Sequence, residues 1–110
     1  MTIRDIIESK KFRLICEGDE PDREIETVFC CDLLSVAMSK GPEGAAWVSV
    51  MGNINALAVM SLTDMACQIL AEGAQLDEQA IAKAKEEGLA VFATDGPIFE
   101  TALEIREMMN

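Results

Sequence analysis

The sequence predicts an α/β fold: a small three-layer domain in which a mainly parallel or mixed sheet of about five strands carries helices on both faces. Strand-like and helix-like segments alternate through the second half of the chain, an order that is typical of parallel strands joined by crossover helices. Half of the 110 residues are apolar, enough to bury a core without disulfide or metal support. The length suits one domain, so we expect residues 1–110 to fold as a single unit.

Residue propensity and turn residues predict where each element lies. Apolar runs rich in β-branched or aromatic residues predict strands at residues 12–16, 26–31, 46–51, 66–70 and 89–93. Helices are expected to begin after Thr2, at Asp32 and after Asn53. The fourth helix is expected to have Asp77 and Glu78 in its first turn, and the last to have Pro97 at its first position. Glycine and proline at 41–44, and Gly88, are expected to end two of them.

Helical spacing also predicts which faces are buried. In the third helix the apolar face consists of Ile54, Leu57, Ala58 and Leu62. In the last helix the buried side is expected to consist of Ile98, Phe99, Ala102, Leu103 and Ile105.

The charge balance excludes several classes of partner. Nine basic residues stand against twenty acidic ones, which gives a net charge of −11 with no histidine. Because such a surface repels phosphate backbones and anionic lipid, we expect neither nucleic acid nor a membrane as partner. Polar residues interrupt the apolar run 45–71 too often for a membrane span. The N-terminus has no signal-peptide pattern, so we expect a cytoplasmic protein.

The residues available for chemistry argue against an enzyme. With no histidine and no tyrosine, the usual general bases and imidazole ligands are missing, and no GxxxxGK[ST] phosphate loop occurs. Cys16, Cys30, Cys31 and Cys67 lack the CxxC spacing of metal sites, and we interpret them as reduced core thiols. We therefore expect no catalytic residues, no metal and no cofactor.

Several segments resemble a known family across nearly the whole chain. They are DREI at 22–25, CDLLSVAM at 31–38, CQILAEG at 67–73, the helix at 77–88 and the strand at 89–93. These segments are similar in order and spacing to clostridial-type members of the DRTGG domain family, although Glu24-Ile25-Glu26 replaces the Thr-Gly-Gly of the family's name. The resemblance implies a fold similar to the N-terminal domain of HPr kinase and an accessory role beside CBS domains or in long phosphotransacetylases. Stand-alone members near iron hydrogenase genes imply a redox context.

Polar residues that follow the expected parallel strands form the candidate binding site. Open α/β sheets bind ligands at the carboxyl ends of their strands, where helix N-termini present unpaired amides. The candidate residues are Asp32, Ser35, Gly52, Asn53, Asn55, Glu72, Gly73, Thr94 and Asp95. Each residue also suits a cap or a turn, so the hypothesis depends on their convergence.

Two functions remain open at this point. The first is a non-enzymatic regulatory domain that senses a small polar ligand, for example a nucleotide or a phosphorylated metabolite held by helix amides. The second is an interaction module that docks on a redox enzyme through apolar groups of the last helix and the C-terminal methionines. We expect a homodimer, which is compatible with either function.

Overall fold

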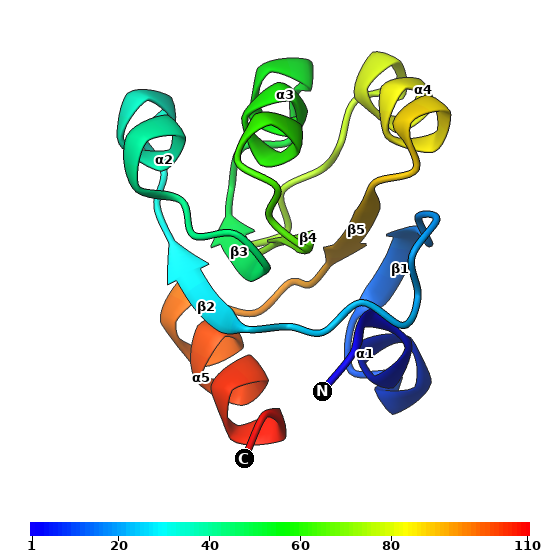
Figure 1. The fold of residues 1–110 in the computed structure, drawn as a ribbon, viewed down its shortest axis with the longest axis vertical. Coiled ribbons are helices and arrows are strands. Elements are labelled where there is room, and N and C mark those ends of the chain that lie inside the picture. The colour runs from blue at the N-terminus through cyan, green and yellow to red at the C-terminus, as the bar shows by residue number, and fades with distance from the viewer.

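The computed structural model describes residues 1–110 and contains five helices and five strands (Figure 1). The helices are α1 (Ile3–Ser9), α2 (Leu34–Lys40), α3 (Ile54–Leu62), α4 (Glu78–Glu87) and α5 (Ile98–Met108). The strands are β1 (Arg13–Cys16), β2 (Thr27–Cys30), β3 (Ala45–Ser49), β4 (Cys67–Leu70) and β5 (Ala90–Ala93). The predicted α/β class is confirmed, and every expected element is present with bounds that differ by a few residues.

The strands form one mixed sheet in the order β1-β5-β4-β3-β2. β2 to β5 are parallel neighbours, whereas β1 pairs antiparallel with β5. Each parallel strand lies beside its predecessor in the chain, so all three crossovers run in the same direction and the right-handed rule places α2, α3 and α4 on one face. Figure 1 shows these three helices together on one side of the sheet and α1 and α5 on the other.

Alternate residues of the central strands contribute to cores on the two faces of the sheet. In β3, Ala46 and Val48 face α1 and α5, where Ile6 and Ile105 are buried with them. Trp47 faces the opposite side and packs under α2 and α3. Every residue of β3, β4 and β5 is buried, as parallel strands with both faces covered require.

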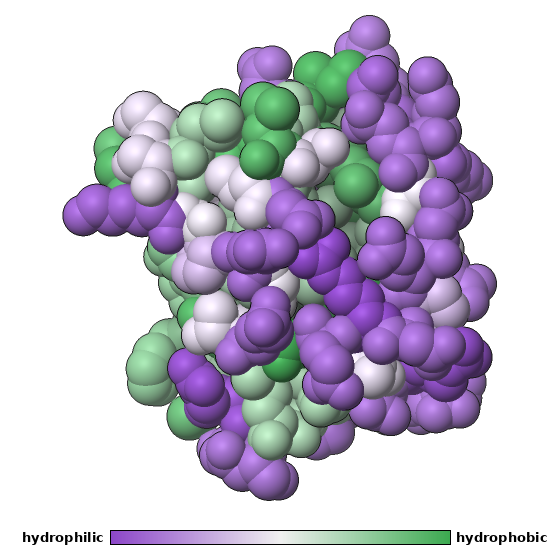
Figure 2. Space-filling model, viewed as in Figure 1, coloured by the Kyte–Doolittle hydropathy of each residue, from purple (hydrophilic) through white to green (hydrophobic).

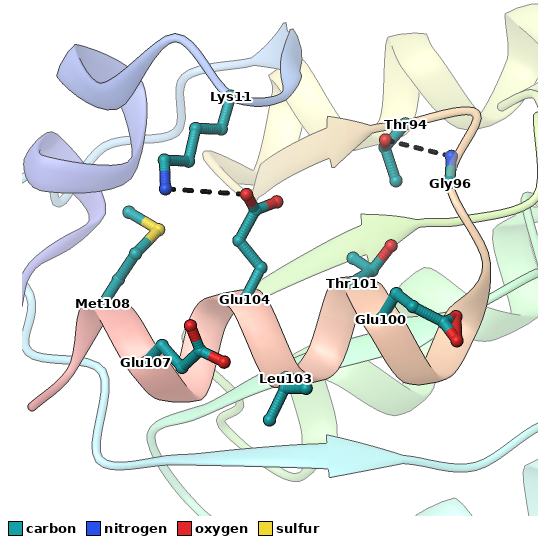
Figure 3. Close-up of a pocket in the computed structure, with 9 residues that line it drawn as sticks. All are labelled: Lys11, Thr94, Gly96, Glu100, Thr101, Leu103, Glu104, Glu107 and Met108. Atoms are coloured by element: carbon teal, nitrogen blue, oxygen red, sulfur yellow. Dashed lines mark hydrogen bonds and ion pairs between the residues drawn. The ribbon is translucent and has the colours of Figure 1, made fainter.

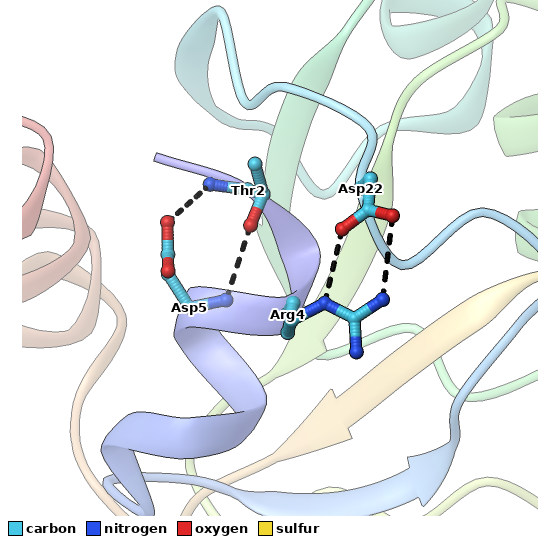
Figure 4. A network of polar contacts seen from close by, with 4 residues as sticks. All are labelled: Thr2, Arg4, Asp5 and Asp22. Atoms are coloured by element: carbon cyan, nitrogen blue, oxygen red, sulfur yellow. Dashed lines mark hydrogen bonds and ion pairs between the residues drawn. The ribbon is translucent and has the colours of Figure 1, made fainter.

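Three helices begin at residues whose side chains cap them, two of which, Thr2 and Asn53, were predicted to do so. Thr2 and Asp5 form a reciprocal capping box, in which each side chain accepts a hydrogen bond from the backbone amide of the other (Figure 4). Asn53 and Asp77 each accept from the amide three residues later and so cap α3 and α4. Gly88 ends α4 in the left-handed conformation, which glycine adopts without steric cost.

The buried face predicted for α3 is partly wrong. Leu57 is buried, but Ile54 is only half-buried, and Ala58 and Leu62 are exposed. The buried residues are Ala56, Leu57, Val59 and Met60. The helix lies between α2 and α4 and above the sheet, so it contacts protein on three sides. A single apolar stripe is therefore a poor description of its environment.

The buried face of α5 is also rotated relative to the prediction. Ile105 is buried as expected, but Phe99 is 69% exposed and Leu103 is 43% exposed. Thr101 takes a place in the buried face and is only 4% exposed. Because α5 packs on β2 and β3 through the positions of Ile98, Thr101 and Ile105, the side with Phe99 and Leu103 faces solvent.

The prediction of four core cysteines holds for two of them. Cys16 and Cys67 are buried, and complete burial raises the pKa of the Cys67 thiol to about 12. Cys31 is half-buried, and Cys30 is exposed because β2 is an edge strand. All four thiols are free.

The visible surface is mainly hydrophilic, with a few apolar residues exposed. Figure 2 shows hydrophilic side chains over most of one face, and hydrophobic ones gathered near α3 and beside α5. The large exposed apolar residues are Leu14, Leu33, Met38, Val50, Leu62, Phe99 and Leu103. None of the helices combines the length and the apolar character that crossing a bilayer requires.

Candidate functional site

The loops after β2, β3, β4 and β5 leave the sheet at one rim, because parallel strands end on the same side. All nine predicted site residues therefore lie along this rim or in the first turn of the helix that follows. They do not share one cavity: Thr94 lines a large hollow, and the other eight line none.

At the β2 end of the rim, Asp32 connects two loops instead of capping a helix. Its carboxylate accepts a hydrogen bond from the Val50 amide at 2.8 Å. α2 consequently begins after Leu33 without a side-chain cap, contrary to the expectation that Asp32 would start it. Ser35 is exposed in the first turn of this helix and contacts none of the other predicted site residues through a hydrogen bond.

Above β3, the space expected for a ligand is filled by the protein. A side chain at Gly52 would collide with the carbonyl oxygen of Gln75, so the loop before α4 packs directly on this backbone. The Asp77 amide donates to the Gly52 carbonyl at 3.3 Å and holds the loop there. Asn53 is used as the cap of α3, and Asn55 is exposed.

Between β4 and β5 the two following loops part toward opposite faces of the sheet. The loop after β4 leads to α4 on one face, and the loop after β5 leads to α5 on the other (Figure 1). Such a divergence is where open α/β sheets form their ligand crevices. This position is therefore the best candidate site that the topology offers.

Three hydrogen bonds join the loop after β4 to the loop after β5 and to the start of α5, at the point where the two loops diverge. The Glu72 amide donates to the Gly96 carbonyl at 2.8 Å, and the Gly73 amide donates to the Thr94 carbonyl at 3.0 Å. The Glu72 carboxylate accepts from the Ile98 amide at 3.0 Å, in the first turn of α5. A carboxylate thus occupies the place where this helix would meet an anion.

A hollow of about 540 Å³ opens on the α5 side of this parting point (Figure 3). Nine residues line it: Lys11, Thr94, Gly96, Glu100, Thr101, Leu103, Glu104, Glu107 and Met108. Lys11 comes from the turn before β1 and the glutamates come from α5, so the hollow joins the two ends of the chain. Asp95 lies outside it, where its carboxylate accepts from Arg13 at 3.3 Å.

Two threonine hydroxyls lie at the floor of the hollow beside Gly96. A Cβ on Gly96 would stand 3.4 Å from the Thr101 Oγ1 and 3.6 Å from the Thr94 Oγ1. The Thr94 hydroxyl accepts from the Gly96 amide at 3.2 Å. The Thr101 hydroxyl takes part in none of the protein's own hydrogen bonds, although the residue is 4% exposed. It therefore presents a free donor and acceptor to whatever enters.

The wall of the hollow is acidic. Lys11 pairs with Glu104 at 3.5 Å, whereas Glu100 and Glu107 form no ion pair. Sequence reasoning missed these residues, although glutamates at positions 100, 104 and 107 repeat at helical spacing and so share one face. Nothing in the sequence indicated Thr101, because threonine in a helix is ordinarily a surface or packing residue.

A second polar group is isolated within the core below the rim. Gln68 of β4 is fully buried, and its Nε2 donates to the Ser49 Oγ and the Met51 carbonyl, both at 3.0 Å. Its Oε1 has no partner. No cavity reaches this oxygen, and no cluster of cysteine and acidic residues is arranged to hold a metal ion.

The fold of this chain is similar to that of a protein of known crystal structure. The CBS and DRTGG domains of the regulatory region of Clostridium perfringens pyrophosphatase, complexed with the activator diadenosine tetraphosphate, match this chain with a TM-score of 0.66. The fold is DRTGG-like. The match covers 94% of this chain at 14% sequence identity, and the chain spans 44% of the pyrophosphatase fragment. No family model and no curated protein matches the sequence.

In this DRTGG-like fold, the neighbouring residues Asp22 and Arg23 each have a structural partner. Asp22 accepts two hydrogen bonds from Arg4 of α1, which lower the pKa of the Asp22 carboxyl (Figure 4). Arg23 donates to the Asp64 carboxylate at 2.8 Å and to the Asp64 carbonyl at 2.7 Å. Both pairs tie the loop before β2 to neighbouring elements, at the rim opposite the hollow.

Proposed function

We propose that the chain is a non-catalytic regulatory or accessory domain that binds a small polar ligand. The observation that carries the proposal is the hollow beside α5, which is lined by Thr101, a residue only 4% exposed whose hydroxyl has no hydrogen-bond partner in the protein. The DRTGG-like fold supports the proposal, since the pyrophosphatase fragment that shares it is a regulatory region. Of the nine residues predicted from the sequence, Thr94 lines this hollow.

The residues of the site favour binding over catalysis. The hollow contains hydroxyls, carboxylates and one lysine whose ammonium is paired with Glu104. The chain has no histidine, and the one lysine of the hollow is held in its ion pair with Glu104. We therefore propose that this site binds a ligand and does not catalyse a reaction.

Nucleotides and phosphorylated metabolites are one class of ligand to test. The pyrophosphatase fragment was complexed with diadenosine tetraphosphate, which makes this class a reasonable starting point. A phosphate at the first turn of α5 would have to replace the Glu72 carboxylate on the Ile98 amide. The Glu72→Gln variant, which removes the competing charge, should therefore bind such ligands more tightly than the parent protein.

A thermal-shift panel tests the proposed function. A ligand that binds only the folded state raises the apparent melting temperature in proportion to its saturation. The panel should contain nucleotides, sugar phosphates, neutral polyols and amines, each at millimolar concentration. Stabilisation by one class, weakened by Gly96→Ala at the floor of the hollow, is expected; no shift with any class contradicts the proposal.

A docking function has its own supporting observation. Phe99 and Leu103 lie one turn apart on α5 and expose apolar surface, and β2 is a free edge strand beside this helix. The partner we propose for this surface is a redox enzyme such as an iron hydrogenase, or a second copy of the chain in a homodimer. The four free thiols fit the reducing cytoplasm in which such an enzyme works.

The docking function is tested by measuring the oligomeric mass of the protein and by capturing partners from the native host. Light scattering after size exclusion should give a dimer mass that Phe99→Ser converts to a monomer, whereas Leu62→Ser on α3 leaves it unchanged. Capture of a redox enzyme from the native host by the parent protein, lost in Phe99→Ser, supports the enzyme as partner. A monomer that captures nothing rules out both forms of docking.

A further inference from the structure

We infer that the hollow beside α5 binds an aliphatic di- or polyamine. This inference rests on the proposed ligand-binding function and gives its ligand a chemical class. It combines three observations: a 540 Å³ hollow, a row of carboxylates along one wall, and an unused hydroxyl at the floor.

The charge of the hollow selects against anions and in favour of cations. Three glutamates and one lysine line it, and the Lys11 ammonium is already paired with Glu104. A phosphate group placed there would face the unpaired carboxylates of Glu100 and Glu107 with no free cation to hold it. Like charges at such distances repel, and the whole chain, with a net charge of −11, adds to the effect.

The spacing of the carboxylates suits a linear molecule with two or more ammonium groups. Glu100 and Glu107 are seven residues apart on one face of α5, which corresponds to about 10.5 Å along the helix axis. Glu104 lies between them (Figure 3). An extended polyamine of similar length can place a terminal ammonium near each outer carboxylate and a central nitrogen near Glu104.

The remaining lining residues complement the rest of such a ligand. Leu103 and Met108 offer apolar contacts for methylene segments between the nitrogens. The Thr101 hydroxyl is the neutral acceptor for an ammonium hydrogen, and it has no competing partner within the protein. The Lys11–Glu104 pair spans 3.5 Å between half-exposed side chains, so an incoming amine can replace the lysine at low cost.

Titration calorimetry with spermidine at low and at physiological ionic strength tests the inference. We expect one molecule bound per chain, with an affinity that falls as salt is added. Glu107→Gln and Glu100→Gln should each weaken binding about two- to fivefold, as expected for partly exposed ion pairs. Thr101→Val removes the free hydroxyl with little change of shape, and Gly96→Ala places a methyl group between the two hydroxyls; both should weaken binding.

Three controls separate a built site from diffuse attraction. Glu86→Gln on α4 removes an exposed, unpaired helical glutamate far from the hollow and should leave the affinity unchanged. A monoamine of similar carbon content should bind much more weakly, and Mg²⁺ should not displace spermidine at equal charge concentration. If Glu86→Gln weakens binding as much as Glu107→Gln, or if Mg²⁺ competes equally, the inference is wrong. The melting curve of each variant shows whether it is folded.

The outcome also distinguishes this inference from the proposed function. If spermidine fails to bind while another class in the thermal-shift panel stabilises the protein through Gly96, the amine assignment fails and the ligand-binding function stands. If neither spermidine nor any other class binds, both fail.

Discussion

The Glu72 carboxylate accepts a hydrogen bond from the Ile98 amide at 3.0 Å, across 26 residues of sequence. The last helix is thus capped by the loop after β4, because its own N-cap, Pro97, has no side chain that can accept. Glu72 itself adopts the left-handed conformation, with a φ of 61°. The same loop that shapes the parting point therefore also fixes the start of α5.

Replacing Glu72 with alanine should destabilise the protein. The substitution removes the only side-chain cap of α5, and lost caps cost about 0.5 to 2 kcal/mol. Glu72→Gln retains an acceptor oxygen and should cost less. Urea unfolding followed by circular dichroism measures both; equal stability of Glu72→Ala and the parent would show that the cap contributes nothing.

Alanine at Gly52 should be far more costly than alanine at Gly96. The added methyl group at position 52 would collide with the Gln75 carbonyl and displace the loop before α4, at about 1 to 3 kcal/mol. At position 96 the nearest atoms are two hydroxyl oxygens at van der Waals distance, so the change should stay within about 0.5 kcal/mol. Thermal denaturation of the two variants side by side makes the comparison. Similar melting temperatures would mean that the Gln75 loop yields easily.

Arg23 should stabilise the fold at neutral pH, and this contribution should decrease in acid. Its hydrogen bonds to Asp64 lower the pKa of that carboxyl below its ordinary value of 3.8. A group whose folded-state pKa is depressed stabilises the fold fully above the unfolded-state pKa, and the contribution disappears as the pH falls through the folded-state pKa. Arg23→Met should therefore cost about 1 to 2 kcal/mol at neutral pH, with Asp64 largely exposed and partly screened, and progressively less below pH 3.8.

Urea titrations between neutral pH and strong acid measure this difference. Arg106→Met is the matched control, because Arg106 has no carboxylate partner and its small effect should not change with pH. A difference between Arg23→Met and the parent that persists undiminished in acid would refute the role of the Arg23–Asp64 pair.

The cysteines should react with thiol reagents in the order of their exposure. Cys30 is accessible, but its partial burial and the nearby Asp32 carboxylate raise its pKa, so it should alkylate more slowly than free cysteine. Cys67, with a pKa of about 12, should react only after unfolding. Mass spectrometry of iodoacetamide-treated protein identifies the sites. Labelling of Cys67 in the native protein would reveal an opening of the core.

Local signals in the sequence predict the helices and strands, but they do not predict the contacts between them. The capping residues Thr2 and Asn53 and the terminating Gly88 act where expected, because these contacts involve residues three or four positions apart. Asp77 was expected in the first turn of α4 and caps that helix from the preceding position. Asp32 behaves differently because its partner, the Val50 amide, is brought near only by the pairing of β2 with β3. A contact made by the sheet cannot be predicted from spacing.

The sequence predicted a site along this rim, and Thr94 alone of the predicted residues lines the hollow. Parallel strands bring the loops of Gly52, Glu72 and Thr94 to one side, as periodicity implied. Whether space remains among them depends on how the Gln75 loop packs and on the face that α5 turns toward the sheet. Those are properties of the assembled fold, so the hollow with Thr101 and the glutamates of α5 became visible only in three dimensions.

The position of β1 has a consequence for biosynthesis. Its partner β5 is the last of the five strands, with Arg13 opposite Ala93. While the ribosome extends the nascent polypeptide, β1 must wait unpaired until β5 has been made. The successive parallel units can assemble in the order of their synthesis, whereas β1 can join the sheet only after the last parallel strand has emerged.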